Sequence, residues 1–224
     1  GLDIDDRAAQ LAYFSVMMKA CQYDKRFLRR KVQPHVYAIV ESNHVNPNVV
    51  DYFCNGDAKL KAAMDTIIEE LHDAKEYGSI ITVSQQDWDA LYARFDEIQN
   101  ESVMSIYTDA ALKLKMMVEV AEVLAKQFNV AITNPPYMGS RKSMNPALKK
   151  YVEKRYPDSK SDLYTVFIER LMNFTKVNGL AALVTQQSFM FTDDYKELRV
   201  KMLSSSHFVN MVHLGADAFP EING

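Results

Sequence analysis

Glycine is scarce in this sequence, with seven residues in a chain of 224. No two of them are separated by a single residue, so the chain contains neither G-x-G-x-x-G nor the P-loop motif. As it stands, the sequence therefore has no glycine-rich loop to hold a phosphate group. It also lacks H-E-x-x-H and G-x-S-x-G, and its five histidines are scattered rather than clustered.

Cysteine, long apolar runs and net charge are limited as well. Cys21 and Cys54 are too few and too far apart for a zinc site, so we expect buried thiols and no metal. No apolar run reaches membrane-spanning length and the first residues do not resemble a signal peptide, which predicts a cytoplasmic protein with no membrane partner. The net charge of −3 gives no overall attraction for nucleic acid, so such binding requires a local basic patch.

What the sequence does contain is an alternation of helical and β-type patterns. Apolar residues recur at three- and four-residue spacing in the helical segments, and short β-branched runs separate these segments. This order predicts an α/β fold with a mainly parallel sheet and helices on both faces. The expected strands are 2–5, 36–40, 79–83, 128–133, 180–185 and 208–214, and the expected helices are 6–21, 58–74, 87–98, 108–127, 162–174 and 193–203.

The most informative stretch is Asn134-Pro135-Pro136-Tyr137, which follows the apolar run 130–133. Two consecutive prolines supply no backbone N–H, so a central strand must end there. The strand end then offers the Asn134 side-chain carbonyl, the proline carbonyls and a flat aromatic ring. This set suits a planar amine such as the exocyclic amino group of a base, although a proline-rich turn capped by an aromatic residue fits the four residues equally well.

An acidic residue ends the first expected strand. In α/β domains that bind nucleosides, a carboxylate at such a strand end can accept hydrogen bonds from both ribose hydroxyls, which makes Asp3 a candidate. Asp5 or Asp6 is instead expected to cap the helix that follows. That helix carries one apolar face, made of Ala8, Leu11, Phe14, Met18 and Cys21.

The segment 138–160 is locally basic. It has five net positive charges on an acidic chain, so it is a candidate phosphate-binding surface. The alternative is the solvated face of a helix over residues 148–156. The basic residues are Arg141, Lys142, Lys149, Lys150, Lys154, Arg155 and Lys160.

Several spaced motifs make the chain resemble the amino-methyltransferases that act on DNA. They are the acid-ended strand, N-P-P-Y, D-L-Y-x-x-F at 162–167, the buried strand after an Asn-Gly pair, and L-G-x-x-x-F-P at 214–220. The N-P-P-Y-M-G-S run and the length of the helical insertion look closest to the adenine-specific methyltransferases of BREX-type phage-defence systems, the PglX enzymes, and to large type II restriction-modification enzymes. The resemblance covers nearly the whole chain and is most specific over 128–220.

The resemblance implies transfer of a methyl group from S-adenosylmethionine to an adenine flipped out of double-stranded DNA. The catalytic motif would comprise Asn134, Pro135, Pro136 and Tyr137. Asn134 and the Pro135 carbonyl would accept hydrogen bonds from the target amine, and Tyr137 would stack on the base. Phe219 matches the family's second aromatic residue and would close the other face of the base, or it packs on its own domain. Other defence-system proteins are possible partners by the same resemblance.

On the cofactor side, Asp3 matches the ribose-binding acid and Ile4 the apolar contact to the adenine ring. Tyr164 and Phe167 match the helix that borders the cofactor, although aromatic residues three apart on a helix are also typical of a core. Asp73 is the candidate for the acid that holds the cofactor's adenine amine. The glycine-rich motif, which the family places on a strand just before residue 1, is absent. We therefore expect residues 1–224 alone to bind S-adenosylmethionine weakly and to be inactive.

The resemblance also divides the chain. Residues 1–29 and 111–224 would form an incomplete Rossmann-like methyltransferase core, without the glycine-rich motif and the target-recognition domain. Residues 30–110 would form a mostly helical insertion that includes a core strand near 79–83.

Other functions use the same four residues. Glutamine-N5 protein methyltransferases act on an equally planar amide, and RNA base and cytosine-N4 methyltransferases act on similar amines. The basic segment, the Phe219 match and the long insertion favour DNA over a short peptide substrate. A non-catalytic alternative is a DNA-binding scaffold within a defence complex.

Overall fold

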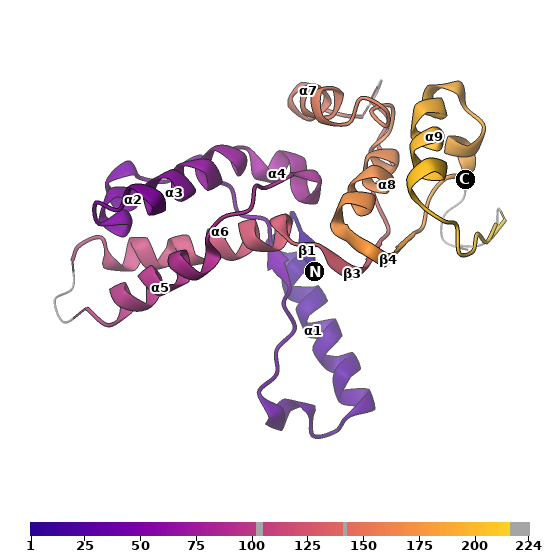
Figure 1. The fold of residues 1–224 in the computed structure, drawn as a ribbon. Coiled ribbons are helices and arrows are strands. Elements are labelled where there is room, and N and C mark those ends of the chain that lie inside the picture. The colour runs from indigo at the N-terminus through magenta and orange to yellow at the C-terminus, as the bar shows by residue number, and fades with distance from the viewer. Residues whose placement is uncertain (102–104, 141–142, 216–224) are drawn as a thin grey trace.

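The strands of the protein form two parallel pairs in the computed structural model, which describes residues 1–101, 105–140 and 143–215 (Figure 1). β1 (Leu2–Asp3) pairs with β2 (Tyr37–Ala38), and β3 (Phe128–Thr133) pairs with β4 (Thr175–Leu183). The expected mixture of helices and parallel strands is therefore confirmed. Within the described residues, the two pairs are not hydrogen-bonded to each other as one sheet.

The first helix, α1 (Asp6–Tyr23), begins where the sequence indicates. The Asp5 carboxylate accepts hydrogen bonds from two N–H groups of its first turn, as expected for an N-cap. The expected apolar face does not pack against a core, because Leu11, Phe14 and Met18 are 66, 59 and 50% exposed. Figure 1 shows why: α1 points away from the other helices.

The largest hydrophobic core lies among helices between the two strand pairs in the sequence. These are α2 (Pro47–Cys54), α3 (Ala58–Glu70), α4 (Ala74–Tyr77), α5 (Trp88–Gln99) and α6 (Thr108–Ala125). Phe53 and Phe95 meet at its centre, with ring centroids 4.6 Å apart, and both are buried. The helices expected near 58–74, 87–98 and 108–127 are confirmed, with α3 ending at residue 70 and the short α4 following it.

The strand expected near 79–83 is not formed. The chain instead makes a 3₁₀ helix, η2 (Gly78–Ile80), followed by an irregular segment. The isoleucines of this stretch are buried, as the apolar run indicates, but side chains rather than a neighbouring strand satisfy its carbonyls. Tyr156 and Arg170 donate these hydrogen bonds. Burial of an apolar run therefore did not require a β-ladder.

The C-terminal half supports the β3–β4 pair. Its elements are α7 (Pro146–Arg155), α8 (Leu163–Phe174), η3 (Gln187–Met190), η4 (Asp193–Tyr195) and α9 (Lys196–Ser205). In the N-terminal part, a 3₁₀ helix, η1 (Phe27–Arg30), lies between α1 and β2. The expected helix 162–174 is confirmed, but β4 starts directly at Thr175, earlier than expected.

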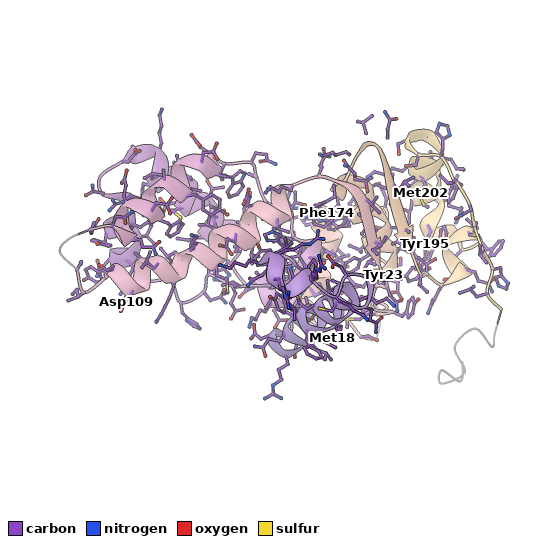
Figure 2. All side chains as sticks on the ribbon, turned by 90° about the horizontal axis from the view of Figure 1, so that it is seen from below. Met18, Tyr23, Asp109, Phe174, Tyr195 and Met202 are labelled. Carbon is purple, nitrogen blue, oxygen red and sulfur yellow. The ribbon has the colours of Figure 1, made fainter. Side chains whose placement is uncertain are left out.

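The strand expected at 208–214 is also not formed. No described strand pairs with it, and Val209 is 78% exposed. A β-branched run forms a strand only where it pairs with another strand, and none of the described strands pairs with this segment. In Figure 2, the labelled Tyr195 and Met202 mark the helices that precede it, on the side of the molecule away from Asp109.

Candidate active site

The N-P-P-Y stretch begins where β3 ends. Thr133 lies opposite Leu183 of β4, and the Val184 N–H donates to the Thr133 carbonyl at 3.3 Å. Pairing stops there because the prolines that follow have no N–H group. The predicted strand end is therefore confirmed, and the parallel strands β3 and β4 end at the same edge of the sheet.

Asn134 presents its side chain to solvent. It is exposed, and its amide has no hydrogen-bond partner among the described residues. Pro135 is buried beside it and Pro136 is exposed. The amide carbonyl is thus free to accept a hydrogen bond from an incoming amine, while the buried proline fixes the backbone next to it.

Tyr137 is held by two side-chain contacts although its ring is 46% exposed. Its hydroxyl donates to the Val184 carbonyl at 3.3 Å. Its ring meets the ring of Tyr164 edge to face, with centroids 5.9 Å apart and an interplanar angle of 61°. These two contacts restrain the orientation of a ring that stays partly exposed, three residues after Asn134.

The residues after Tyr137 are fastened to the start of α8. The Asp162 carboxylate oxygen Oδ1 accepts hydrogen bonds from the N–H groups of Met138 at 3.0 Å and Tyr164 at 3.3 Å. The Leu163 N–H donates to the Met138 carbonyl at 3.0 Å, and Gly139 forms an antiparallel bridge with Asp162. The loop is therefore anchored to the first turn of α8.

Tyr164 is fully buried, whereas Phe167 is only partly buried. Tyr164 has no exposed surface, and its hydroxyl is 2.8 Å from the Ser188 hydroxyl. Burial raises the pKa of Tyr164 above its ordinary value. Phe167 packs on a different cluster, with Leu148, Val152 and Ile80. The structure therefore brings Tyr164, but not Phe167, to the N-P-P-Y stretch.

Asp3 and Ile4 are both exposed at the end of β1. Asp3 accepts a hydrogen bond from the Asp5 N–H at 2.9 Å. Ile4 contacts Gly78 so closely that a Cβ atom added at this glycine would lie 2.8 Å from the isoleucine Cγ2. The end of β1 therefore contacts the 73–78 segment. An ion pair between Lys75 Nζ and Asp6 Oδ2, 3.2 Å apart, reinforces this contact.

Asp73 lies near the β1 end but its carboxylate is already engaged. It accepts a hydrogen bond from the Asn43 side chain at 2.7 Å, and it is 3.0 Å from the His72 imidazole. Its own N–H donates to the Asn43 side chain at 2.8 Å, and its φ angle is 54°. These contacts tie Asp73 to Asn43, in the segment that follows β2.

The basic segment forms a helix with a solvated basic face. Leu148 and Val152 of α7 are buried, whereas Lys149, Lys150 and Lys154 are exposed. The Asn145 side chain caps α7 and also donates to Glu76 of α4, which fixes the helix to the rest of the protein. Arg141, Lys142 and Phe219 lie outside the described residues.

Neither a metal site nor a membrane span emerges from the described residues. Within them, no group of three or more His, Cys, Asp or Glu side chains could hold a metal ion. None of the helices in the same ranges combines the length and apolar character needed to cross a membrane.

Comparison with known proteins gives the family. The sequence model of the Eco57I restriction-modification methylase family matches residues 1–219. The chain belongs to this family. It is also 37% identical over 235 residues to the protein named adenine-specific methyltransferase PglX of Lacticaseibacillus casei (strain Zhang), and 37% identical over 248 residues to adenine-specific methyltransferase BrxX of Escherichia coli O9:H4 (strain HS). All of the chain is covered, but only 19% and 20% of these relatives, so it spans about a fifth of their length.

The structure of this Eco57I-family chain adds residues to the site that the sequence analysis did not select. The Val184 carbonyl contacts Tyr137, and Asp162 holds Met138, the residue that follows the N-P-P-Y stretch. Ser188 and Tyr195 contact Tyr164. Only Asp162 had a visible signal, as the acid that opens D-L-Y-x-x-F and caps α8. A main-chain carbonyl such as that of Val184 leaves no signal in a sequence.

Proposed function

We propose that this chain is part of a DNA adenine-N6 methyltransferase, acting in the cytoplasm within a restriction-modification or phage-defence system. The observation that carries the proposal is the exposed and unpaired amide of Asn134, three residues before the restrained ring of Tyr137 in the turn that ends β3. The family match and the names of both relatives support the same reaction.

The reaction needs hydrogen-bond acceptors for the target amine. An adenine amino group is a poor nucleophile because its lone pair is delocalised into the ring. Asn134 and the Pro135 carbonyl would accept its two hydrogens, which favours a tetrahedral nitrogen with its lone pair directed outward. Tyr137 would stack on the base, which offsets part of the cost of flipping it out of the duplex, about a few kcal/mol.

The residues at the end of β1 suit an S-adenosylmethionine cofactor. When bound, this cofactor supplies an electrophilic sulfonium methyl group. The exposed Asp3 carboxylate can accept hydrogen bonds from ribose hydroxyls, and the exposed Ile4 can cover one face of an adenine ring. Asp73 is less suited to hold the adenine amine, since Asn43 and His72 already occupy its carboxylate.

We also propose that both strand pairs belong to one Rossmann-like sheet, with helices on both faces. Residues 1–29 and 111–224 would form the core and residues 30–110 the insertion. In support, β1 and β3 each have an edge without a described partner, and Val130 and Ile132 of β3 are 57 and 76% exposed. Residues 1–224 alone should then bind the cofactor weakly.

The DNA partner would meet the exposed lysines of α7. Lys149 and Lys150 are exposed on α7, which follows the N-P-P-Y stretch in the sequence after residues 138–145. Phosphate contacts at this position would orient double-stranded DNA over the target pocket. The full protein would also bind other proteins of the defence system.

The test is to express the full protein in a host without adenine methylation and to sequence the cellular DNA for modified bases. We expect N6-methyladenine in one sequence motif with the wild type, and none with Asn134→Ala. Asn129→Ala is the matched control, because Asn129 is also exposed and its side chain has no partner among the described residues. Persistent methylation in the Asn134→Ala strain would contradict the proposal.

A further inference from the structure

One carboxylate oxygen joins the loop that follows Tyr137 to the start of α8. Asp162 Oδ1 accepts the Met138 N–H at 3.0 Å and the Tyr164 N–H at 3.3 Å. The main chain adds the Leu163 N–H to the Met138 carbonyl and the Ser140 N–H to the Ser161 carbonyl, both at 3.0 Å. The residue that follows Tyr137 therefore has its position set by the first turn of α8.

The ring of Tyr137 rests on a buried aromatic stack. Tyr164 meets it edge to face, and Tyr195 meets Tyr164 on another side, with centroids 6.2 Å apart and an interplanar angle of 61°. Tyr164 and Tyr195 are 0 and 7% exposed, and the Ser188 hydroxyl lies 2.8 Å from the Tyr164 hydroxyl. Side chains packed this tightly have little freedom to change rotamer, so they provide a rigid base for the exposed ring.

We propose that Asp162 and Tyr164 are positioning residues that fix the ring of Tyr137 for the target base. This inference rests on the proposed methyl transfer and deepens it. Asp162 acts only as a hydrogen-bond acceptor for two main-chain N–H groups, so its negative charge is not required. Tyr164 acts through Tyr137 and not on the cofactor, since it has no exposed surface with which to touch a bound molecule.

The role predicts a specific kinetic pattern. Displacement of reacting groups by about 1 Å can lower a rate about 100-fold. Asp162→Ala should therefore lower the single-turnover rate of methyl transfer about 10- to 100-fold, while DNA affinity changes less than about twofold. Asp162→Asn keeps an acceptor oxygen at the same place, so it should restore the rate to within about threefold of the wild type.

Asp57→Ala separates positioning from simple loss of a helix cap. Asp57 caps α3 in the same way, accepting the N–H groups of Lys59 at 2.7 Å and Leu60 at 3.2 Å, far from the site in the sequence. The Asp57→Ala substitution should lower the melting temperature of the full protein about as much as Asp162→Ala does. The rate of methyl transfer should stay at the wild-type value.

The measurements use the full protein and a duplex that carries its methylated motif. Equal losses of rate in Asp162→Asn and Asp162→Ala would overturn the proposal, because the charge would then matter. A full rate in Asp162→Ala, or a similar loss in Asp57→Ala, would overturn it as well. If Asp162→Ala does not fold, a comparison of Tyr164→Phe with Tyr164→Leu tests the same role. Tyr164→Phe keeps the aromatic ring and should keep the wild-type rate, whereas Tyr164→Leu should lower it. Equal rates in the two variants would refute the inference.

The two proposals fail in different ways. If the wild type methylates no adenine, the proposed function is wrong and the positioning role falls with it. If the wild type methylates adenine and the Asp162 and Tyr164 variants all do so at its rate, only the positioning role is wrong.

Discussion

Arg170 and Phe174 stack one turn apart on α8, with the guanidinium carbon 3.6 Å from the centre of the aromatic ring. The same guanidinium donates to the carbonyls of Ser79 at 3.1 Å and Leu124 at 3.0 Å, and to that of Ile81. Burial lowers the pKa of Arg170 below its ordinary value, and no ion pair to it occurs within the described residues. Together with the Tyr156 hydroxyl, which donates to the Ile80 carbonyl, this side chain replaces the strand pairing that the 79–83 segment lacks.

Replacement of Arg170 should loosen that segment. Arg170→Met leaves buried carbonyls without donors, which should lower the free energy of local opening by about 3 kcal/mol. Hydrogen exchange of peptides covering 78–83 should then become about 100-fold faster. Arg7→Met is the control, because Arg7 is exposed on α1 and its side chain has no described partner. Unchanged exchange in Arg170→Met would show that other contacts hold the segment.

The sequence predicts elements well where local pattern and tertiary environment agree. β3, the stop at the prolines and α8 follow from an apolar run, two missing N–H groups and a capping aspartate. Helix α2 is not among the expected helices, although the sequence carries its start signals: Asn46 accepts the Asn48 N–H at 2.9 Å and a proline opens the helix.

The failures occur where distant residues decide the outcome. The apolar run at 79–83 is buried as a strand would be, but Arg170 lies 91 positions after Ser79 and no local pattern announces the contact. The apolar stripe of α1 correctly gives a helix, yet its spacing does not tell whether a partner surface is present. In the candidate site, Asn134 and Tyr137 were predictable from their chemistry, whereas the Val184 carbonyl that holds Tyr137 was not.

Tyr137 should contribute mainly through its ring. Tyr137→Phe removes only the 3.3 Å hydrogen bond to Val184, so we expect methylation within about threefold of the wild type. Tyr137→Ala removes a stacking surface worth about 1–3 kcal/mol per base, and should lower the rate about 10- to 100-fold. Single-turnover assays of the full protein on its own motif measure both. A rate in Tyr137→Phe as low as that in Tyr137→Ala would mean that the hydroxyl takes part in the reaction.

The exposed lysines of α7 should control DNA affinity and its salt dependence. Lys149→Glu combined with Lys150→Glu should weaken binding to every duplex sequence, and should lower the slope of log affinity against log salt by about two. Fluorescence anisotropy across a sodium chloride series measures the slope. The control double variant is Lys59→Glu with Lys113→Glu, which makes the same change of charge at exposed positions on α3 and α6. Equal slopes in the two double variants would show that α7 does not contact phosphates.

Cys54 should resist alkylation while the protein is folded. It is 3% exposed at the end of α2, and burial raises the pKa of its thiol to about 11. At pH 8 only roughly 0.1% would be thiolate, the reactive form, so iodoacetamide should modify it slowly. Cys21 is half-buried on α1 and serves as the internal comparison, since both cysteine peptides can be followed by mass spectrometry in one sample.

The raised pKa of Cys54 also makes stability depend on pH. Because the Cys54 thiol has a higher pKa in the folded protein than in the unfolded chain, the neutral thiol stabilises the fold at pH values below about 9, and this contribution is lost as the pH rises toward 11. Alkylation of Cys54 should therefore accelerate in that range beyond what deprotonation of a free thiol explains, and equal modification of both cysteines at pH 8 would contradict the packing of α2 described above.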